Sequence, residues 1–203
     1  ALYTQSDGGT GTGVWTRMDN AAELSAGMEI VLASASKGVT AGALSNAVLV
    51  TSESTFSADG QTISVLSGDA LVLTVGGSSG AWTFANSDGQ LLGATAVKKL
   101  AWGSGTTTWT VSISGGSATI QNATSSYGRF LYNHGATRFT TYTSGTSTTM
   151  LLPEIYYLDG TLGTVTYTTN PSGENYTVTF TTPDGITAPA AMTINSLTGA
   201  TLP

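Results

Sequence analysis

Short segments in which apolar and polar residues alternate run along most of this chain, and turn residues separate them. Trp109–Ile113 alternates strictly, while 163–169 and 176–182 alternate β-forming residues with threonine. Alternation with a period of two residues is typical of strands with one buried and one solvated face. Asp-Gly pairs between such segments favour tight hairpin turns. The pattern predicts an all-β protein, with one short helix over Asp19–Leu24 that Asp19 caps.

Two stretches of the chain repeat each other at an offset of roughly 36 to 40 residues. The matched segments are 71–75, 82–86 and 89–93 in the first copy and 109–113, 118–122 and 128–132 in the second. A unit of a few short strands cannot bury its own apolar face, so such copies pack on each other. We therefore expect Leu73 and Val111 to occupy equivalent buried positions, and Leu92 and Leu131 to do the same.

A third, weaker copy begins near Ile30, and repeats of about 40 residues predict a β-trefoil-like barrel. Closure is favoured because Ser- and Thr-rich strands with few charges otherwise leave edges open to other chains. A β-sandwich is the alternative fold. The expected parts are a polar N-terminal arm at 1–13, the trefoil-like domain at 14–158 and a C-terminal β-strand extension at 159–203. That extension is too short to be stable alone, so we expect it to dock on the domain or on a neighbouring subunit.

An aromatic-threonine start at Trp15-Thr16 leads into the segment 22–32, and Trp109-Thr110-Val111 and the aromatic segment 155–158 follow later. In this arrangement residues 14–158 resemble a module found in secreted and surface proteins of gut-type bacteria. The resemblance implies a non-catalytic, trefoil-like accessory module, and it supplies no catalytic residues to transfer. Residues 159–203 lie outside it.

The chain is acidic and sparsely charged: 6 basic and 12 acidic residues give a net charge of −6. Lys98-Lys99 is the one basic pair, far short of the basic stripe that a phosphate backbone requires, so nucleic acid is not expected as a partner. No apolar run is long enough to predict membrane insertion. Cysteine is absent, and the Ser/Thr-rich, lysine-poor composition favours an extracellular or cell-surface location.

Residues suited to catalysis or metal binding form no recognisable pattern. His134 is the only histidine, and no Gly-x-Ser-x-Gly motif accompanies it. Glu23 and Glu29 have no feature that distinguishes them from other surface glutamates. The segment 86–89 lacks the later acidic ligands of a calcium loop, so a hairpin turn explains it better. We expect no catalytic residue, no metal site and no cofactor, and hence a protein that is not an enzyme.

Aromatic side chains beside polar ones are the best candidates for ligand contact. Aromatic rings stack on sugars, while amide and guanidinium groups supply hydrogen bonds. Trp82 and Trp109 lie in strands and are expected in the core, whereas Gly- and Ser-rich surroundings favour greater exposure of Trp102 and Tyr127 than of these two tryptophans. The candidate ligand-binding residues are Trp102, Tyr127, Tyr132, Asn133, His134 and Arg138.

These observations favour an extracellular, non-catalytic β-protein that binds or adheres at a cell surface, with a glycan as its ligand. The alternative is a self-assembling structural subunit of an extracellular filament, pilus-like fibre or surface layer. In that case the strands of 159–203 add to the sheet of a neighbouring copy and build a homo-oligomer or polymer. An enzyme ranks third.

Overall fold

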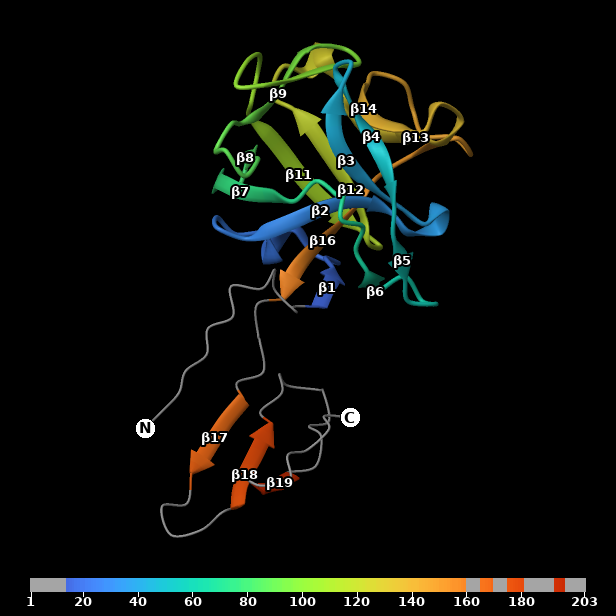
Figure 1. The fold of residues 1–203 in the computed structure, drawn as a ribbon. Coiled ribbons are helices and arrows are strands. Elements are labelled where there is room, and N and C mark those ends of the chain that lie inside the picture. Colours follow the sequence, from blue (N-terminus) through green and yellow to red (C-terminus); the bar gives the residue numbers. More distant parts are fainter. Residues whose placement is uncertain (1–13, 160–164, 170–174, 181–191, 196–203) are drawn as a thin grey trace. The chain divides into compact units, whose positions relative to one another are not determined.

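The structure, a computed structural model, describes residues 14–159 and the backbone of 165–169, 175–180 and 192–195 (Figure 1). The chain divides into a main unit, Val14–Leu158, and a second unit that holds the last three strands. The arm expected at 1–13 lies outside the described residues. The described regular elements are strands and single-turn 3₁₀ helices, so the all-β prediction is confirmed.

The elements have the following bounds. The strands of the main unit are β1 (Val14–Arg17), β2 (Glu29–Ser34), β3 (Val39–Ser45), β4 (Val48–Glu53), β5 (Thr55–Phe56), β6 (Thr62–Val65), β7 (Leu73–Ser78), β8 (Ala81–Ala85), β9 (Leu92–Ala96), β10 (Lys99–Trp102), β11 (Trp109–Ser114), β12 (Ser117–Asn122), β13 (Arg129–Asn133), β14 (Arg138–Tyr142), β15 (Met150–Leu151) and β16 (Glu154–Asp159). The 3₁₀ helices are η1 (Ala21–Glu23), η2 (Ala35–Lys37), η3 (Ser125–Tyr127) and η4 (His134–Ala136). The second unit contains β17 (Val165–Thr169), β18 (Asn175–Phe180) and β19 (Met192–Asn195), which pair in that order.

The short helix expected over 19–24 is a single 3₁₀ turn, η1, with a different cap. The Asn20 side chain accepts a hydrogen bond from the Ala22 N–H at 2.9 Å, which is the role expected of Asp19. Asp19 instead accepts a hydrogen bond from Arg17 Nε, also at 2.9 Å. Leu24 is already extended, so the turn ends there and the chain continues into β2.

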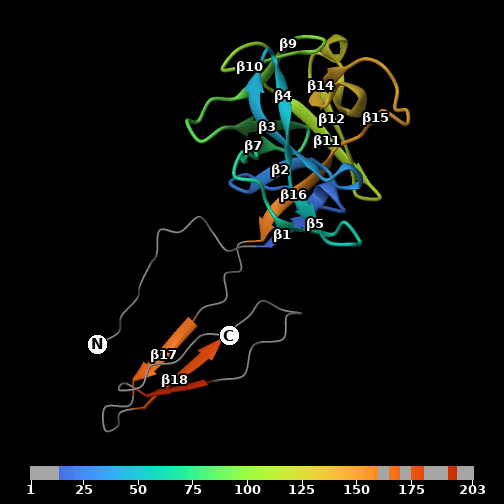
Figure 2. The ribbon, with the colours of Figure 1, turned by 45° about the vertical axis from the view of Figure 1, so that its right-hand side comes forward.

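Strand pairing in the main unit is antiparallel, and six of its strands form a cycle. β2 pairs with β7, β7 with β8, β8 with β11, β11 with β12, β12 with β16, and β16 with β2 again. The three remaining long hairpins are β3–β4, β9–β10 and β13–β14. Two views place β9 and β14 at the end of the unit away from β1 (Figures 1 and 2).

These three hairpins contact one another. β14 pairs with β4 through Phe139 and Leu49. The Leu100 N–H of β10 donates to the Ala47 carbonyl in the β3–β4 turn at 2.8 Å. The Lys98 N–H in the β9–β10 turn donates to the Thr141 carbonyl of β14 at 3.0 Å. As a result, each hairpin is fixed by backbone bonds to its neighbours, and their turns have defined relative positions.

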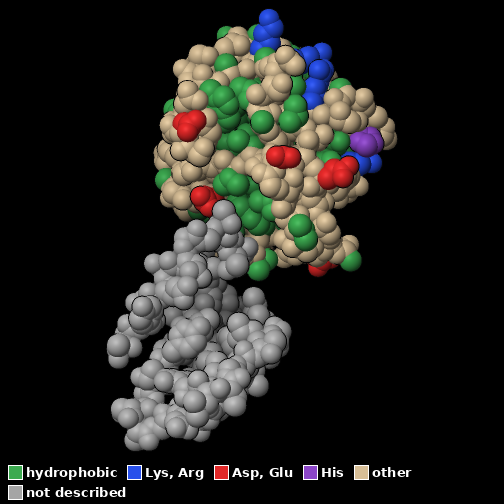
Figure 3. Space-filling view, viewed as in Figure 1, with side chains coloured by type: hydrophobic (Ala, Val, Ile, Leu, Met, Phe, Trp, Pro, Cys, Tyr) green, Lys and Arg blue, Asp and Glu red, His purple; other side chains and the backbone are tan. Residues whose placement is uncertain are grey.

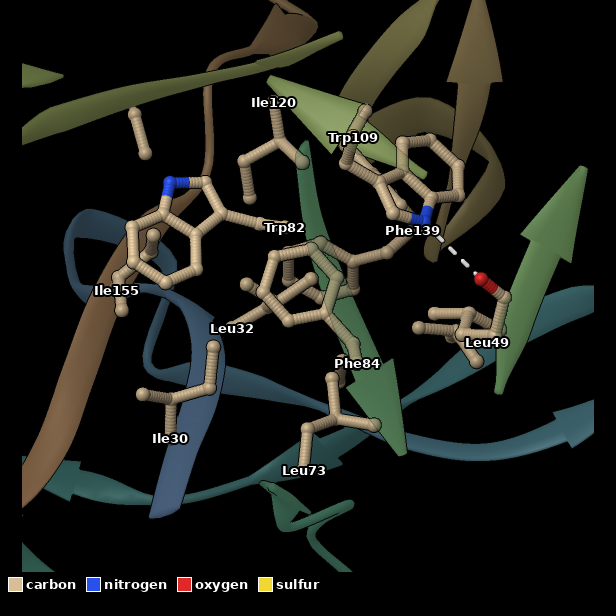
Figure 4. Packing of buried hydrophobic residues seen from close by; sticks show 14 of the residues in the cluster. Ile30, Leu32, Leu49, Leu73, Trp82, Phe84, Trp109, Ile120, Phe139 and Ile155 are labelled. Atoms are coloured by element: carbon tan, nitrogen blue, oxygen red, sulfur yellow. Dashed lines mark hydrogen bonds between the residues drawn. The ribbon is translucent and has the colours of Figure 1, made fainter. Parts of the chain in front are cut away.

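The main hydrophobic core receives side chains from all six strands of the cycle and from the three hairpins (Figure 4). Trp109 of β11 has no exposed surface, and its Nε1 donates to the Leu92 carbonyl at 3.0 Å. Its ring lies 4.9 Å from that of Phe130, measured between centroids. Trp82 is buried in the same core, so the core placement expected for both tryptophans is confirmed.

β2 and β16 are buried on both faces. Ile30 of β2 and Ile155 of β16 face the main core, whereas Val31 and Tyr156 pack into a second cluster beside β1 and β6. Strands buried on both sides read as continuous apolar runs rather than as alternating ones. This explains why the sequence of β2 shows no alternation.

The hairpins β7–β8 and β11–β12 share a register, but not the one expected from the sequence. The pairs next to the two turns are Ser78–Ala81 and Ser114–Ser117. Counted back from these turns, Leu73 corresponds to Trp109. The expected equivalence of Leu73 with Val111 is therefore wrong by two residues, and Val111 is only half-buried.

The second expected pair, Leu92 and Leu131, is also misaligned. An isolated bridge joins Ala85 to Leu91, and the matching pair in the other copy joins Gln121 to Arg129. Leu92 thus corresponds to Phe130, and both belong to the main core. Leu131 is fully buried but lies one position further along.

Candidate functional site

Two of the candidate residues, Asn133 and Arg138, converge on the phenol of Tyr142. They face each other across the β13–β14 hairpin. Asn133 Nδ2 and Arg138 Nε each donate a hydrogen bond to the Tyr142 hydroxyl at 3.1 Å. Asn133 also caps η4, because its Oδ1 accepts the Ala136 N–H at 3.0 Å. The phenol oxygen therefore accepts two hydrogen bonds while its own proton can still be donated.

Lys98 reaches the same phenol from the β9–β10 turn. Its Nζ lies 5.4 Å from the centroid of the Tyr142 ring, within the range of a cation–π contact. We call Lys98, Asn133, Arg138 and Tyr142 the Tyr142 cluster. Tyr142 is only 5% exposed, whereas Asn133 and Arg138 are half-buried, so the polar groups rather than the ring reach the surface.

The Tyr142 cluster lies in a positively charged part of an acidic protein. The segments 92–102 and 129–142, which form the two hairpins, contain Lys98, Lys99, Arg129 and Arg138 but no Asp or Glu. Arg129 pairs directly with Tyr142 across β13 and β14. Figure 3 shows Lys and Arg side chains at the end of the unit where Figure 1 labels β9 and β14, and a further basic side chain lower down, beside the histidine and a carboxylate. The surroundings of the cluster favour a ligand that is anionic or rich in hydrogen-bond acceptors.

Tyr132 and His134 interact with each other rather than with Tyr142. The Tyr132 hydroxyl and His134 Nδ1 are 3.3 Å apart. Tyr132 is buried, its ring lies 4.7 Å from that of Phe139, and burial raises the pKa of its phenol. His134 is exposed in η4. Tyr132 therefore belongs to the core and anchors an exposed histidine at the end of the hairpin.

Trp102 and Tyr127 are used in packing. Both are partly buried against the main core, and both are more exposed than Trp82 and Trp109, which is the order that the sequence predicts. Trp102 ends β10 opposite Leu92, and Tyr127 ends η3.

Comparisons with protein-family models, with curated proteins and with solved structures find no match to this chain. The site is therefore interpreted from its own geometry. Among the described residues, no three His, Asp or Glu side chains gather closely enough to hold a metal ion. In the same part of the chain, no helix has the length and apolar character needed to cross a membrane.

Two surface hollows beside β4 do not include the candidate residues. One, of about 390 Å³, is lined by 37–39, 53–55 and Val65. The other, of about 650 Å³, is lined by Ala43, 50–53 and 67–71. Hydroxyl groups in this region are bonded to each other, as in the 2.5 Å contact between Ser52 Oγ and Ser67 Oγ. The linings also include the charged residues Lys37, Glu53 and Asp69, but none of the candidate residues.

Glu154 is a partly buried carboxylate at the start of β16. Its Oε2 accepts the Ala35 N–H at 2.6 Å, and its Oε1 lies 3.9 Å from Arg17 Nη1. Burial raises the pKa of Glu154, and this outweighs the lowering effects of the Ala35 N–H and of Arg17. Asp59 is the opposite case: the Ser57 hydroxyl, followed by the Gln61 N–H, lowers the pKa of its carboxyl.

The opposite pKa shifts of Glu154 and Asp59 predict that their contributions to stability change in opposite directions with pH. A group with a raised folded-state pKa binds protons more readily in the folded protein, so its contribution to stability is lost as pH rises through that pKa. Compared with Glu154→Gln, the wild type should gain thermal stability as pH falls from about 7 toward the ordinary glutamate pKa of 4.5. Compared with Asp59→Asn, it should lose stability as pH falls through the Asp59 pKa. Melting temperatures from circular dichroism at several pH values measure both differences, and a Glu154 difference that shrinks on acidification contradicts the prediction.

Proposed function

We propose that the main unit is a β-trefoil, in which a six-stranded barrel is closed at one end by three hairpins. The cycle of six paired strands supports this proposal, because a β-sandwich has two sheets with separate edges. The mutual contacts of β3–β4, β9–β10 and β13–β14 support it as well. So does the shared register of β7–β8 and β11–β12.

We further propose that this unit is an extracellular, non-catalytic module that binds a glycan on or near a cell surface through the Tyr142 cluster. The observation that carries the proposal is the convergence of Asn133 and Arg138 on the Tyr142 hydroxyl at 3.1 Å. This arrangement holds an amide and a guanidinium in fixed orientations before any ligand arrives. Preorganisation of this kind reduces the entropy lost on binding.

The chemistry of the cluster suits sugar hydroxyl groups. A hydroxyl both donates and accepts hydrogen bonds, and the cluster offers guanidinium and ammonium donors beside a phenol that acts as either partner. In the part of the chain that the structure describes, no protein acceptor bonds to the terminal nitrogens of Arg138. Because the Tyr142 ring is nearly buried, the contact relies on hydrogen bonds rather than on stacking.

Removing the guanidinium should weaken glycan binding strongly. Hydrogen bonds to charged groups contribute about 1.5–3 kcal/mol, so Arg138→Gln should reduce affinity by about 10- to 100-fold. The experiment is an array of immobilised glycans, followed by calorimetric titration of each glycan that the wild type binds. Lys37→Gln is the matched control, because it removes one positive charge from η2, at a residue that lines the first surface hollow and not the Tyr142 cluster.

The outcomes separate cleanly. Lower affinity for Arg138→Gln with wild-type affinity for Lys37→Gln supports the proposal. Equal binding by all three proteins places the contact elsewhere, and a wild type that binds no glycan on the array contradicts the glycan function itself.

Self-assembly is the second candidate, and one observation favours it. The strands β17, β18 and β19 form a sheet of their own, and within the described tail nothing pairs with the outer sides of β17 and β19. Such edges are templates for a strand of a second copy. Light scattering of the full chain discriminates between the candidates: polymers favour a structural subunit, whereas monomers favour the binding module.

A further inference from the structure

We infer that the face of the β13–β14 hairpin that carries Arg129, Thr140 and Arg138 contains a subsite for an oxyanion, a carboxylate or sulfate group that the bound glycan carries. This inference deepens the proposed function and rests on glycan binding at the Tyr142 cluster. It rests on two unpartnered polar atoms, on the distribution of charge and on the geometry of one strand face.

Two buried side-chain polar atoms have no hydrogen-bond partner within the described residues, Arg129 Nε and Thr140 Oγ1. Both belong to the β13–β14 hairpin. Burying a polar group without a partner costs stability, so each such group calls for a specific explanation. Two of them on one hairpin, beside a polar cluster, point to a partner that the described residues do not supply.

The two unpartnered groups share a strand face with the Tyr142 cluster. Residues directly opposite each other in an antiparallel pair lie on the same face, and so do residues two apart on one strand. Arg129 is opposite Tyr142, and Asn133 is opposite Arg138. Thr140 lies midway between Arg138 and Tyr142 on β14, with no exposed surface. The long side chains of Arg129 and Arg138 therefore flank Thr140 from the two ends of the hairpin.

Every free group on this face can donate a hydrogen bond, and most are cationic. Arginine and lysine have donors but no acceptor, and the threonine hydroxyl can donate as well. The two hairpins contain no carboxylate that could neutralise them, although the whole chain carries twice as many acidic as basic residues. A ligand group that satisfies such a face must accept several hydrogen bonds and carry negative charge. Carboxylate and sulfate oxygens meet both requirements, and guanidinium binds them with charge-assisted bonds.

The experiment compares matched glycans with the full chain. Calorimetric titration uses a sulfated polysaccharide, its chemically desulfated form and a polyuronate. We expect the desulfated form to bind at least about tenfold more weakly than the sulfated one, and the affinity for both acidic forms to fall as NaCl is added. The acidic form that binds more tightly identifies which oxyanion the subsite takes.

Two substitutions test the location of the subsite. Arg129→Gln and Thr140→Val should each reduce the preference for the acidic form, while Lys37→Gln retains it. Thr140→Val keeps the shape of the side chain and removes only the unpartnered hydroxyl, so the variant is expected to fold. Chemical shifts of the backbone amides near Thr140 and Arg129 on titration with inorganic sulfate give a readout that needs no glycan.

Each outcome supports or overturns the inference. Tighter binding of an acidic glycan by the wild type, reduced in both Arg129→Gln and Thr140→Val, supports the inference. Equal affinity for sulfated, desulfated and uronate forms overturns it and leaves the proposed glycan function standing. If sulfate changes the amide chemical shifts at Thr140 but no glycan binds, the oxyanion subsite is supported and the glycan function is overturned. Absence of both sulfate-dependent shifts and an acidic preference overturns the subsite.

Discussion

Replacing Trp109 with alanine will lower the free energy of unfolding by about 3–5 kcal/mol. The side chain has no exposed surface, packs against Phe130 and donates a hydrogen bond to the Leu92 carbonyl. Alanine leaves a cavity where the six-strand cycle meets the β9–β10 and β13–β14 hairpins. It also leaves a buried carbonyl without its donor. Both losses fall at one point of the core, so the effect is large for a single substitution.

Two further variants separate packing from hydrogen bonding. Trp109→Phe retains much of the apolar volume but loses the indole N–H, and we expect about 1–3 kcal/mol for it. Val65→Ala on β6, where the side chain is 62% exposed, should change stability by less than about 0.5 kcal/mol. Urea titration followed by tryptophan fluorescence or circular dichroism gives the three values. A Trp109→Ala protein as stable as Val65→Ala would show that the core is not where we place it.

Gly128→Ala is the second substitution with a large expected effect. Gly128 has φ +86° and ψ −163°, a conformation that is almost restricted to glycine. A Cβ atom at this position would collide with the Tyr142 carbonyl group, which is backbone and cannot rotate away. The Gly128 carbonyl also accepts the Asn122 N–H at 3.0 Å and Gln121 Nε2 at 2.8 Å, so this segment has little room to shift. Strain and overpacking together should cost about 3–5 kcal/mol.

Gly135→Ala provides the control within the same hairpin. A Cβ atom at Gly135 would lie 3.6 Å from Asn133 Oδ1, which is an ordinary contact, and the φ of Gly135 is not left-handed. We expect a change below about 0.5 kcal/mol for this variant. Thermal or urea unfolding of both variants measures the difference. If Gly128→Ala and Gly135→Ala have the same stability, the backbone conformation described for Gly128 is wrong.

The sequence predicts where the strands lie better than it predicts which residues of the two repeated hairpins correspond. Strict alternation in 109–113 identified β11, and the following Gly-Gly pair identified its turn. The equivalence of Leu73 and Val111 was wrong because a shift of two residues leaves an alternating pattern unchanged, whereas a shift of one reverses every face. The pattern therefore fixed which residues face inward but not how far each lies from its turn. The pairing register decided that Trp109 is the counterpart of Leu73.

The site could be predicted only where its residues are close in the sequence. Asn133 and Arg138 were found because both lie close to Tyr132 and His134 in the sequence. Tyr142 was missed as a partner, although the spacing of Arg138, Thr140 and Tyr142 on an alternating strand already places them on one face. No local sequence pattern indicates that Lys98 reaches the site, because the hydrogen bond from its backbone N–H to the Thr141 hydroxyl spans 43 residues. Such a contact depends on how the hairpins pack, which local patterns do not encode.

The pairing of β16 with β2 has a consequence for how the chain folds. The hydrogen bond from the Ala35 N–H, directly after β2, to the Glu154 side chain at the start of β16 connects residues 119 positions apart, so most of the unit must be present before it forms. The chain loses the entropy of closing this long loop before the contacts that compensate for it have formed. Topologies with such distant contacts typically fold in milliseconds to seconds. A nascent chain that ends before Glu154 exposes the edges of β2 and β12 together. Unpaired strand edges are templates for aggregation, so the interval before β16 is made is the step at which the folding chain is most exposed to it.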